Sequence, residues 1–96
     1  MGVVEVTRFH LADGVGDDAF LTLDRRFQNE LVPNRPGFLR RTTARRGGDW
    51  VVVTLWSSED DASSFERATA SDPLVVELAR QVAPGSLQRA RFDTLD

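Results

Sequence analysis

The stretch DWVVVTLW, residues 49–56, predicts a β-strand that is apolar on both of its faces. Valine, threonine and tryptophan are enriched in strands, where successive side chains point to opposite faces. The side chains that share a face are Val51, Val53 and Leu55 on one side and Val52, Thr54 and Trp56 on the other. An antiparallel sheet with one face in water would alternate apolar with polar residues. We therefore expect both faces of this strand to be covered.

A helix is predicted before this strand, over residues 17–31. The apolar side chains that recur there at three- and four-residue spacing are Phe20, Leu23, Phe27 and Leu31. Such spacing gives one apolar stripe along a helix. Asp17 or Asp18 suits the N-cap position. The sequence PNRPG, residues 33–37, ends the helix because proline cannot continue it.

A second helix is predicted directly after the strand. Ser58 suits its N-cap, and the acids that follow complement the positive end of the helix dipole. Asp72 and Pro73 interrupt this helix and restart it, with the proline at the first helical position. The buried stripe of the restarted part consists of Leu74, Leu78 and Val82.

Three further strands complete the pattern, over residues 3–11, 38–46 and 86–95. Gly47 and Gly48 join 38–46 to the apolar strand and indicate a hairpin. The order β-α-β-β-α-β is that of the ferredoxin-like α+β fold, a four-stranded antiparallel sheet with helices on one face. In its usual topology the first and third strands are central. The second strand carries four arginines, which suit an edge because charge discourages stray pairing.

The second face of this sheet lacks a cover within one chain, because two helices cover only one face. Full burial is worth about 1.5–3 kcal/mol for a side chain such as Val51, Val53 or Leu55. A homodimer in which two sheets pack face to face would supply that burial. The alternative is a monomer that leaves some valines exposed, which protein surfaces tolerate. We favour the homodimer through the sheet face.

The composition excludes several classes of function. The 96 residues, 41% hydrophobic and 28% charged, suit a single globular domain over residues 1–96. With no cysteine and one histidine, a metal site within one chain is not expected. A net charge of −3 argues against nucleic acid as a partner. No apolar run is long enough for a membrane span, and MGVVEVTRFH lacks a signal-peptide layout, so we expect a cytoplasmic protein.

Two segments resemble the antibiotic biosynthesis monooxygenase (ABM) family of dimeric α+β barrels. They are PGFLRRTTAR, residues 36–45, and DWVVVTLWSSEDDASSF, residues 49–65. In that family a Pro-Gly-Phe sequence opens the second strand. The third strand ends in a tryptophan, and an acidic helix start runs to a phenylalanine. The likeness covers nearly the whole chain in the order of its elements.

The resemblance implies a pocket between the sheet and its own helices, and a function. The quinone-forming members need no cofactor, neither metal nor flavin, because a deprotonated electron-rich phenol reduces oxygen itself. We therefore expect a cofactor-independent monooxygenase for a small aromatic molecule, polyketide-like or a quinol. The alternatives are a non-catalytic small-ligand-binding or stress-related protein, or a relative of the family's cyclases and isomerases. The haem-degrading members of the superfamily carry an iron-binding histidine in the second helical region. Residues 71–83, the corresponding stretch here, contain no histidine, so haem ligation is not expected.

Four residues are candidates for a catalytic role. Trp56 matches the family's tryptophan at the strand end and would stack on a planar substrate, although it could equally be core. Thr7 stands where some members place an asparagine, and its hydroxyl lacks the paired donor and acceptor of that amide. Glu5 shares its face and could act as a base if it is buried without a cationic partner. His10, expected on the opposite face or at the rim, is the one histidine of the sequence and a candidate for general acid-base catalysis.

Three residues are candidates for substrate binding, namely Phe27, Phe9 and Arg40. The two phenylalanines would form parts of the pocket wall if they are not core. Arg40 and its neighbours Arg41, Arg45 and Arg46 could bind an anion through bidentate contacts. A solvated hairpin edge explains the four arginines more simply.

Overall fold

The computed structural model, which describes residues 2–96, has a four-stranded antiparallel sheet in the order β2-β3-β1-β4. The strands are β1 (Val3–Phe9), β2 (Phe38–Arg46), β3 (Asp49–Trp56) and β4 (Gln88–Asp93). The two strands predicted to be central, β1 and β3, lie in the middle. The ferredoxin-like α+β fold is therefore confirmed.

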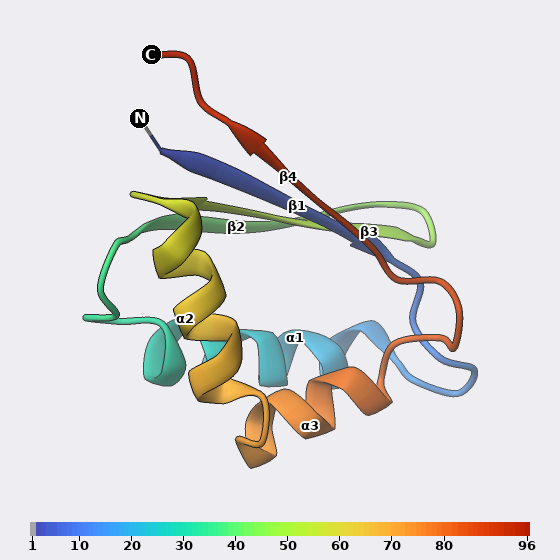
Figure 1. The fold of residues 1–96 in the computed structure, drawn as a ribbon. Coiled ribbons are helices and arrows are strands. Elements are labelled where there is room, and N and C mark those ends of the chain that lie inside the picture. Colours follow the sequence, from blue (N-terminus) through green and yellow to red (C-terminus); the bar gives the residue numbers. More distant parts are fainter. Residues whose placement is uncertain (1) are drawn as a thin grey trace.

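The helices all lie against the same face of the sheet (Figure 1). They are α1 (Asp17–Arg26), the π-helix η1 (Phe27–Leu31), α2 (Glu59–Thr69) and α3 (Pro73–Arg80). Ser58 and Asp72 cap α2 and α3 as predicted, because their side chains accept hydrogen bonds from the backbone N–H groups of Asp61 and Leu74. Within the described residues, the opposite face of the sheet carries no helix (Figure 1).

The predicted helix over residues 17–31 differs from the structure at both ends. Gly16 is the N-cap and makes no side-chain hydrogen bond, so the cap is neither Asp17 nor Asp18; both lie in the first turn, where they still favour the dipole. From Phe27 the chain continues as a π-helix. Wider turns of this kind are rare and often occur at functional sites.

Two strands are shorter than the sequence predicts. The first ends at Phe9 and the last spans Gln88–Asp93, instead of 3–11 and 86–95. Beyond Phe9 the backbone bonds to the loop before β4: the His10 carbonyl accepts from the Ala83 N–H at 2.8 Å, and the His10 N–H donates to Ser86 Oγ at 3.1 Å. These loop contacts replace the strand ladder.

The alternation predicted for residues 49–56 is present in β3. The residues buried against the helices are Trp50, Val52, Thr54 and Trp56, whereas Val51, Val53 and Leu55 are half-buried on the other face. Pairing extends that outer face across the sheet, because Val4 lies opposite both Leu55 and Phe92. Phe92 is 56% exposed there.

Two aromatic clusters fix the helices to the sheet. Phe9, Phe20 and Trp50 form one, with the Phe20 and Trp50 ring centroids 5.0 Å apart. The other contains Trp56 and Phe65, whose centroids are 5.1 Å apart. In residues 2–96, no helix is long and apolar enough to cross a membrane.

Candidate functional site

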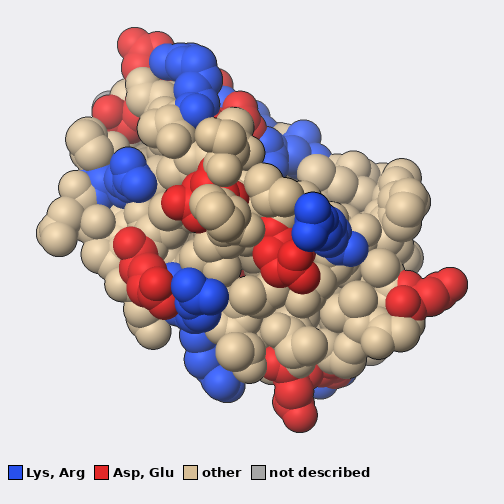
Figure 2. Space-filling model, turned by 90° about the horizontal axis from the view of Figure 1, so that it is seen from below, with Lys and Arg blue, Asp and Glu red and all other residues tan. Residues whose placement is uncertain are grey.

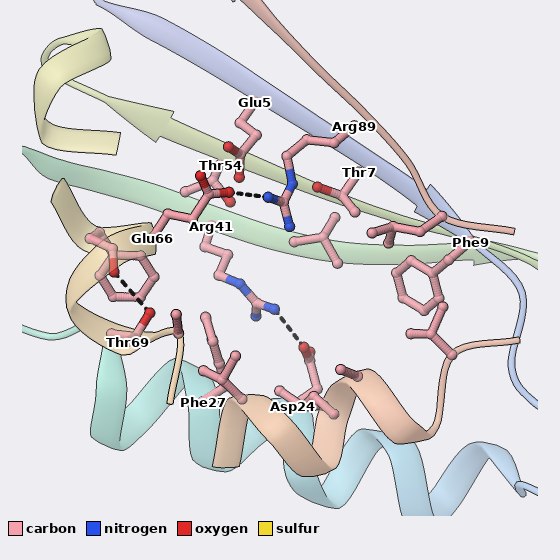
Figure 3. A pocket seen from close by; sticks show the side chains of 18 of the residues that line it. Glu5, Thr7, Phe9, Asp24, Phe27, Arg41, Thr54, Glu66, Thr69 and Arg89 are labelled. Carbon is pink, nitrogen blue, oxygen red and sulfur yellow. Dashed lines mark hydrogen bonds and ion pairs between the residues drawn. The ribbon is translucent and has the colours of Figure 1, made fainter. Parts of the chain in front are cut away.

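A cavity of about 600 Å³ lies between the sheet and the helices (Figure 3). Its volume falls within the range of about 300–1,000 Å³ that is usual for small-molecule sites. Side chains of all four strands and of the helices line it.

One part of the cavity wall is aromatic. Trp56, at the end of β3, packs against Phe65 of α2, and Phe27 of η1 meets Phe65 edge-on at a centroid distance of 5.9 Å. Trp56 is only 2% exposed, so it serves the core and the cavity wall at once. Phe27 lies beneath Arg41 of β2, whose Cζ is 4.4 Å from the centroid of the phenylalanine ring.

Five of the seven candidate residues line this cavity: Glu5, Thr7, Phe9, Phe27 and Trp56. Three come from β1, where each lies opposite one of the buried, helix-facing residues of β3. Glu5 and Thr7 therefore point the same way, into the cavity (Figure 3).

Glu5 was expected to act as a base only if it were buried without a cationic partner. The structure gives it one, Arg91, so this condition is not met. The Arg91 Nε donates to Glu5 Oε2 at 2.7 Å, and both side chains are mostly buried. Arg91 Nη1 also donates to Glu59 at 2.7 Å and to Ser63 Oγ at 3.0 Å. Burial lowers the pKa of Arg91, but the hydrogen bonds to Glu5 and Glu59 outweigh it, so this pKa lies above its ordinary value.

Ion pairs also join β4 to α2 at the edge of the cavity. Arg89 pairs with Glu66, and both line the cavity (Figure 3). Arg91 Nη2 lies 3.7 Å from the same glutamate. On the helix-covered side, acidic and basic groups are interspersed rather than gathered by sign (Figure 2).

His10 and Arg40 lie away from this cavity. His10 Nε2 is 2.7 Å from Asp49 Oδ1 at an exposed site, beside a separate hollow formed by the loop after β1 and the β2–β3 turn. Arg40 pairs with Leu55 in the sheet and is exposed on the outer face. The structure does not bring either residue together with the other five.

The sequence interpretation missed a buried ion pair in the cavity wall. Arg41 Nη2 donates to Asp24 Oδ1 at 2.7 Å, and the two side chains are 8% and 9% exposed. Thr43 Oγ1 donates to the other carboxylate oxygen, Oδ2, also at 2.7 Å. The expected solvated edge is therefore wrong for Arg41, which faces the helices (Figure 3).

Two signals in the sequence pointed to this pair. Adjacent residues of a strand face opposite ways, so one of Arg40 and Arg41 had to face the helices. Asp24 lies four residues after Phe20 and three before Phe27, inside the apolar stripe. A carboxylate in such a stripe needs a buried partner.

Among residues 2–96, no group of three His, Cys, Asp or Glu side chains is placed to hold a metal ion.

Comparison with solved structures shows what this fold resembles. A point mutant of SnoaB, a cofactor-independent oxygenase from Streptomyces nogalater, superposes with a TM-score of 0.82 at 18% identity, over 99% of this chain and 94% of that one. A protein of Caulobacter crescentus CB15 with the provisional name antibiotic biosynthesis monooxygenase gives 0.77 at 15% identity, over 99% and 91%. A similarly named Nitrosomonas europaea protein gives 0.76 at 12%, over 98% and 90%.

The resemblance to the antibiotic biosynthesis monooxygenases is thereby confirmed at the level of the fold. No family model matches the sequence, and no curated protein matches it. Identities of this size carry the backbone arrangement and leave the activity open.

Proposed function

We propose, because the chain has the fold of proteins named antibiotic biosynthesis monooxygenases, that it is a monooxygenase acting without a cofactor on an aromatic, polyketide-like or quinol substrate. The cavity carries the proposal, since an aromatic wall and a few polar groups enclose about 600 Å³. The chemistry asks for a site that holds a planar ring, favours its phenolate and stabilises developing negative charge.

The reaction balances without a cofactor. For an anthrone, the methylene group loses two hydrogens and becomes a carbonyl, one oxygen atom of O₂ enters the product, and the other leaves as water. The substrate supplies all four electrons, so the protein has only to bind, orient and move protons. Trp56 and Phe27 would pack against the ring, and Thr7 would donate a hydrogen bond to a ring oxygen.

Oxygen uptake with a panel of hydroquinones and anthrones tests the proposal. We expect uptake above the uncatalysed rate, and an anthrone product that has gained one oxygen and lost two hydrogens. Replacing Trp56 by alanine would confound the test, because losing a buried tryptophan costs about 3–5 kcal/mol of stability. Trp56→Phe keeps most of the ring. It should lower the rate about two- to tenfold, since one aromatic contact is worth about 0.5–1.5 kcal/mol.

Trp50→Phe is the matched control. Trp50 is also a buried tryptophan of β3 facing the helices, but it packs against Phe20 and does not line the cavity. Its replacement should leave uptake unchanged. No uptake by the wild type on any substrate would contradict the proposal and favour a non-catalytic small-ligand binder, or a cyclase-like or isomerase-like protein.

A further inference from the structure

The buried pair Asp24–Arg41 has no role in the arrangement described so far, although it lies in the cavity wall. Burying two charges costs several kcal/mol per ion, and apolar side chains of similar volume often stabilise a fold equally well or better. Stability alone therefore does not explain why the pair is present. Arg41 reaches from β2 toward α1 across the cavity, so the binding of a ligand there would explain it (Figure 3).

The guanidinium is held by one strong contact and retains hydrogen-bonding capacity. Arg41 Nη2 makes the 2.7 Å bond to Asp24, whereas Nη1 lies 3.3 Å from Gln28 Oε1 and 3.5 Å from Thr43 Oγ1. Arginine has five N–H donors in a planar fork. The two long contacts of Nη1 are weak, so part of the donor capacity of Arg41, which lines the cavity, remains for a ligand oxygen.

The face of the same guanidinium lies over an aromatic ring. The Arg41 Cζ is 4.4 Å from the centroid of Phe27, a distance at which a cation is attracted to the ring. Asp24 fixes the guanidinium at one end, Phe27 fixes its plane, and Thr43 occupies the second carboxylate oxygen. The donors are therefore oriented before a ligand arrives.

We propose that Arg41, positioned by Asp24 and Thr43, binds the ionised oxygen of a phenolic ligand in this cavity. The inference rests on the proposed function, because it names the residue that favours the phenolate. The aromatic ring of the ligand would lie against the wall formed by Phe27 and Trp56, while its oxygen would accept hydrogen bonds from the guanidinium of Arg41, which lines the cavity. Because Asp24 offsets part of the charge, the guanidinium stabilises the anion without binding every anion tightly.

The test uses 2-hydroxyanthraquinone, a planar phenol whose ionised form absorbs at longer wavelength and which is already a quinone. Titrating the bound probe by its absorbance gives its pKa in the cavity, independently of turnover. We expect a value about one unit or more below that of the free probe, as for an acid beside an arginine. Arg41→Met should abolish the decrease, and Arg41→Lys should keep part of it.

Asp24→Asn separates binding from a merely structural role, because its expected effect has the opposite sign. The amide keeps the shape of the side chain but removes the charge that offsets Arg41, so the bound probe should ionise at still lower pH. Arg45→Met is the matched control. Arg45 also faces the helices from β2 and pairs with Asp17 at 2.8 Å, but it does not line the cavity. Arg45→Met should leave the pKa of the bound probe as it is in the wild type.

Removing one partner of a buried pair can prevent folding. The double variant Asp24→Asn with Arg41→Gln leaves a neutral hydrogen-bonding pair, and it should also lose the decrease. The inference is overturned if wild-type protein fails to bind the probe, if the bound probe shows no decrease, or if the decrease survives in Arg41→Met or in the double variant. Oxygen uptake without an Arg41-dependent shift would leave the proposed function standing alone. An Arg41-dependent shift of the probe's pKa without oxygen uptake on any substrate would support the phenolate site and contradict the proposed monooxygenase function.

Discussion

Asp24 occupies a position in α1 that the apolar stripe would give to a leucine. A carboxylate there is compatible with folding only because Arg41 and Thr43 satisfy its oxygens. The sequence contains both members of the pair, but their meeting depends on how α1 crosses β2. Single residues of this kind show why site prediction is harder than fold prediction.

Gly37 is a second residue whose identity the structure explains. Its φ of +77° lies in the left-handed region that favours glycine, and its carbonyl accepts from the Ser57 N–H at 2.8 Å. A Cβ at this position would overlap the carboxylate of Asp61. The Pro-Gly-Phe sequence before β2 therefore has a conformational and a steric reason.

Gly37→Ala should lower the free energy of unfolding by about 1–3 kcal/mol, because it combines an unfavourable φ with a clash. Urea denaturation followed by tryptophan fluorescence would measure the loss. Gly48→Ala is the control, since a Cβ there meets no atom within 4 Å. It should change stability by less than about 0.5 kcal/mol. Equal losses in the two variants would contradict this explanation.

Among the elements, α2 and β4 are joined by side-chain ion pairs that centre on Arg91. Arg91 contacts Glu5 on β1 and Glu59 on α2. Because its side chain is 19% exposed, and that of Glu5 17%, the contact is better shielded than a surface pair. Helix and strand positions followed from periodicity and caps, but these contacts between elements did not.

Arg91→Met should lower the free energy of unfolding by about 1–3 kcal/mol, because it leaves the Glu5 carboxylate without its partner. Adding Glu5→Gln should recover part of the loss, since the unpaired charge is then removed. Urea denaturation of wild type and both variants measures the two effects. If the double variant is less stable than the single one, the carboxylate is not the source of the loss.

The pH dependence of this effect follows from the raised pKa of Arg91. A group whose pKa is higher in the folded than in the unfolded protein stabilises the fold fully at any pH below its unfolded-state pKa. This stabilisation is lost as the pH rises through the folded-state pKa. Both values are strongly alkaline for arginine. Because Arg91 does not titrate between about pH 7 and pH 9, its titration should leave the difference in free energy of unfolding between wild type and Arg91→Met constant over that range.

The elements also show where sequence periodicity stops being informative. The β2 and β3 boundaries, 38–46 and 49–56, match the structure because a Gly-Gly turn and two apolar runs define them locally. The π-helix over 27–31 was predicted as α-helix, since its side-chain spacing fits both over one turn. The hydrogen bond from the Val32 N–H to the Phe27 carbonyl, five residues earlier, distinguishes them.

At the scale of the whole molecule, the helix-free face of the sheet remains the ground for a homodimer. Val4, Val6 and Val53 are half-buried there, and Phe92 is 56% exposed. An apolar surface shared by three strands is typical of an interaction site. We propose that a second copy of the chain covers it, sheet against sheet.

Val53→Asp should separate the two copies, because it places a charge at the centre of the proposed interface. Light scattering should give twice the chain mass for the wild type and the chain mass for the variant. Val76→Asp, on the exposed side of α3, should remain dimeric. A wild type with the mass of one chain at micromolar concentration would refute the dimer.

The sequence by itself determined the order of elements, the caps at Ser58 and Asp72, and the central position of β1 and β3. These features depend on periodicity and turn chemistry, which act over a few residues. Tertiary structure alone decided that Arg41 lies in the cavity with Asp24, that Arg91 neutralises Glu5, and that His10 and Arg40 lie elsewhere. Such pairings join residues distant in the chain, so their geometry depends on how whole elements pack.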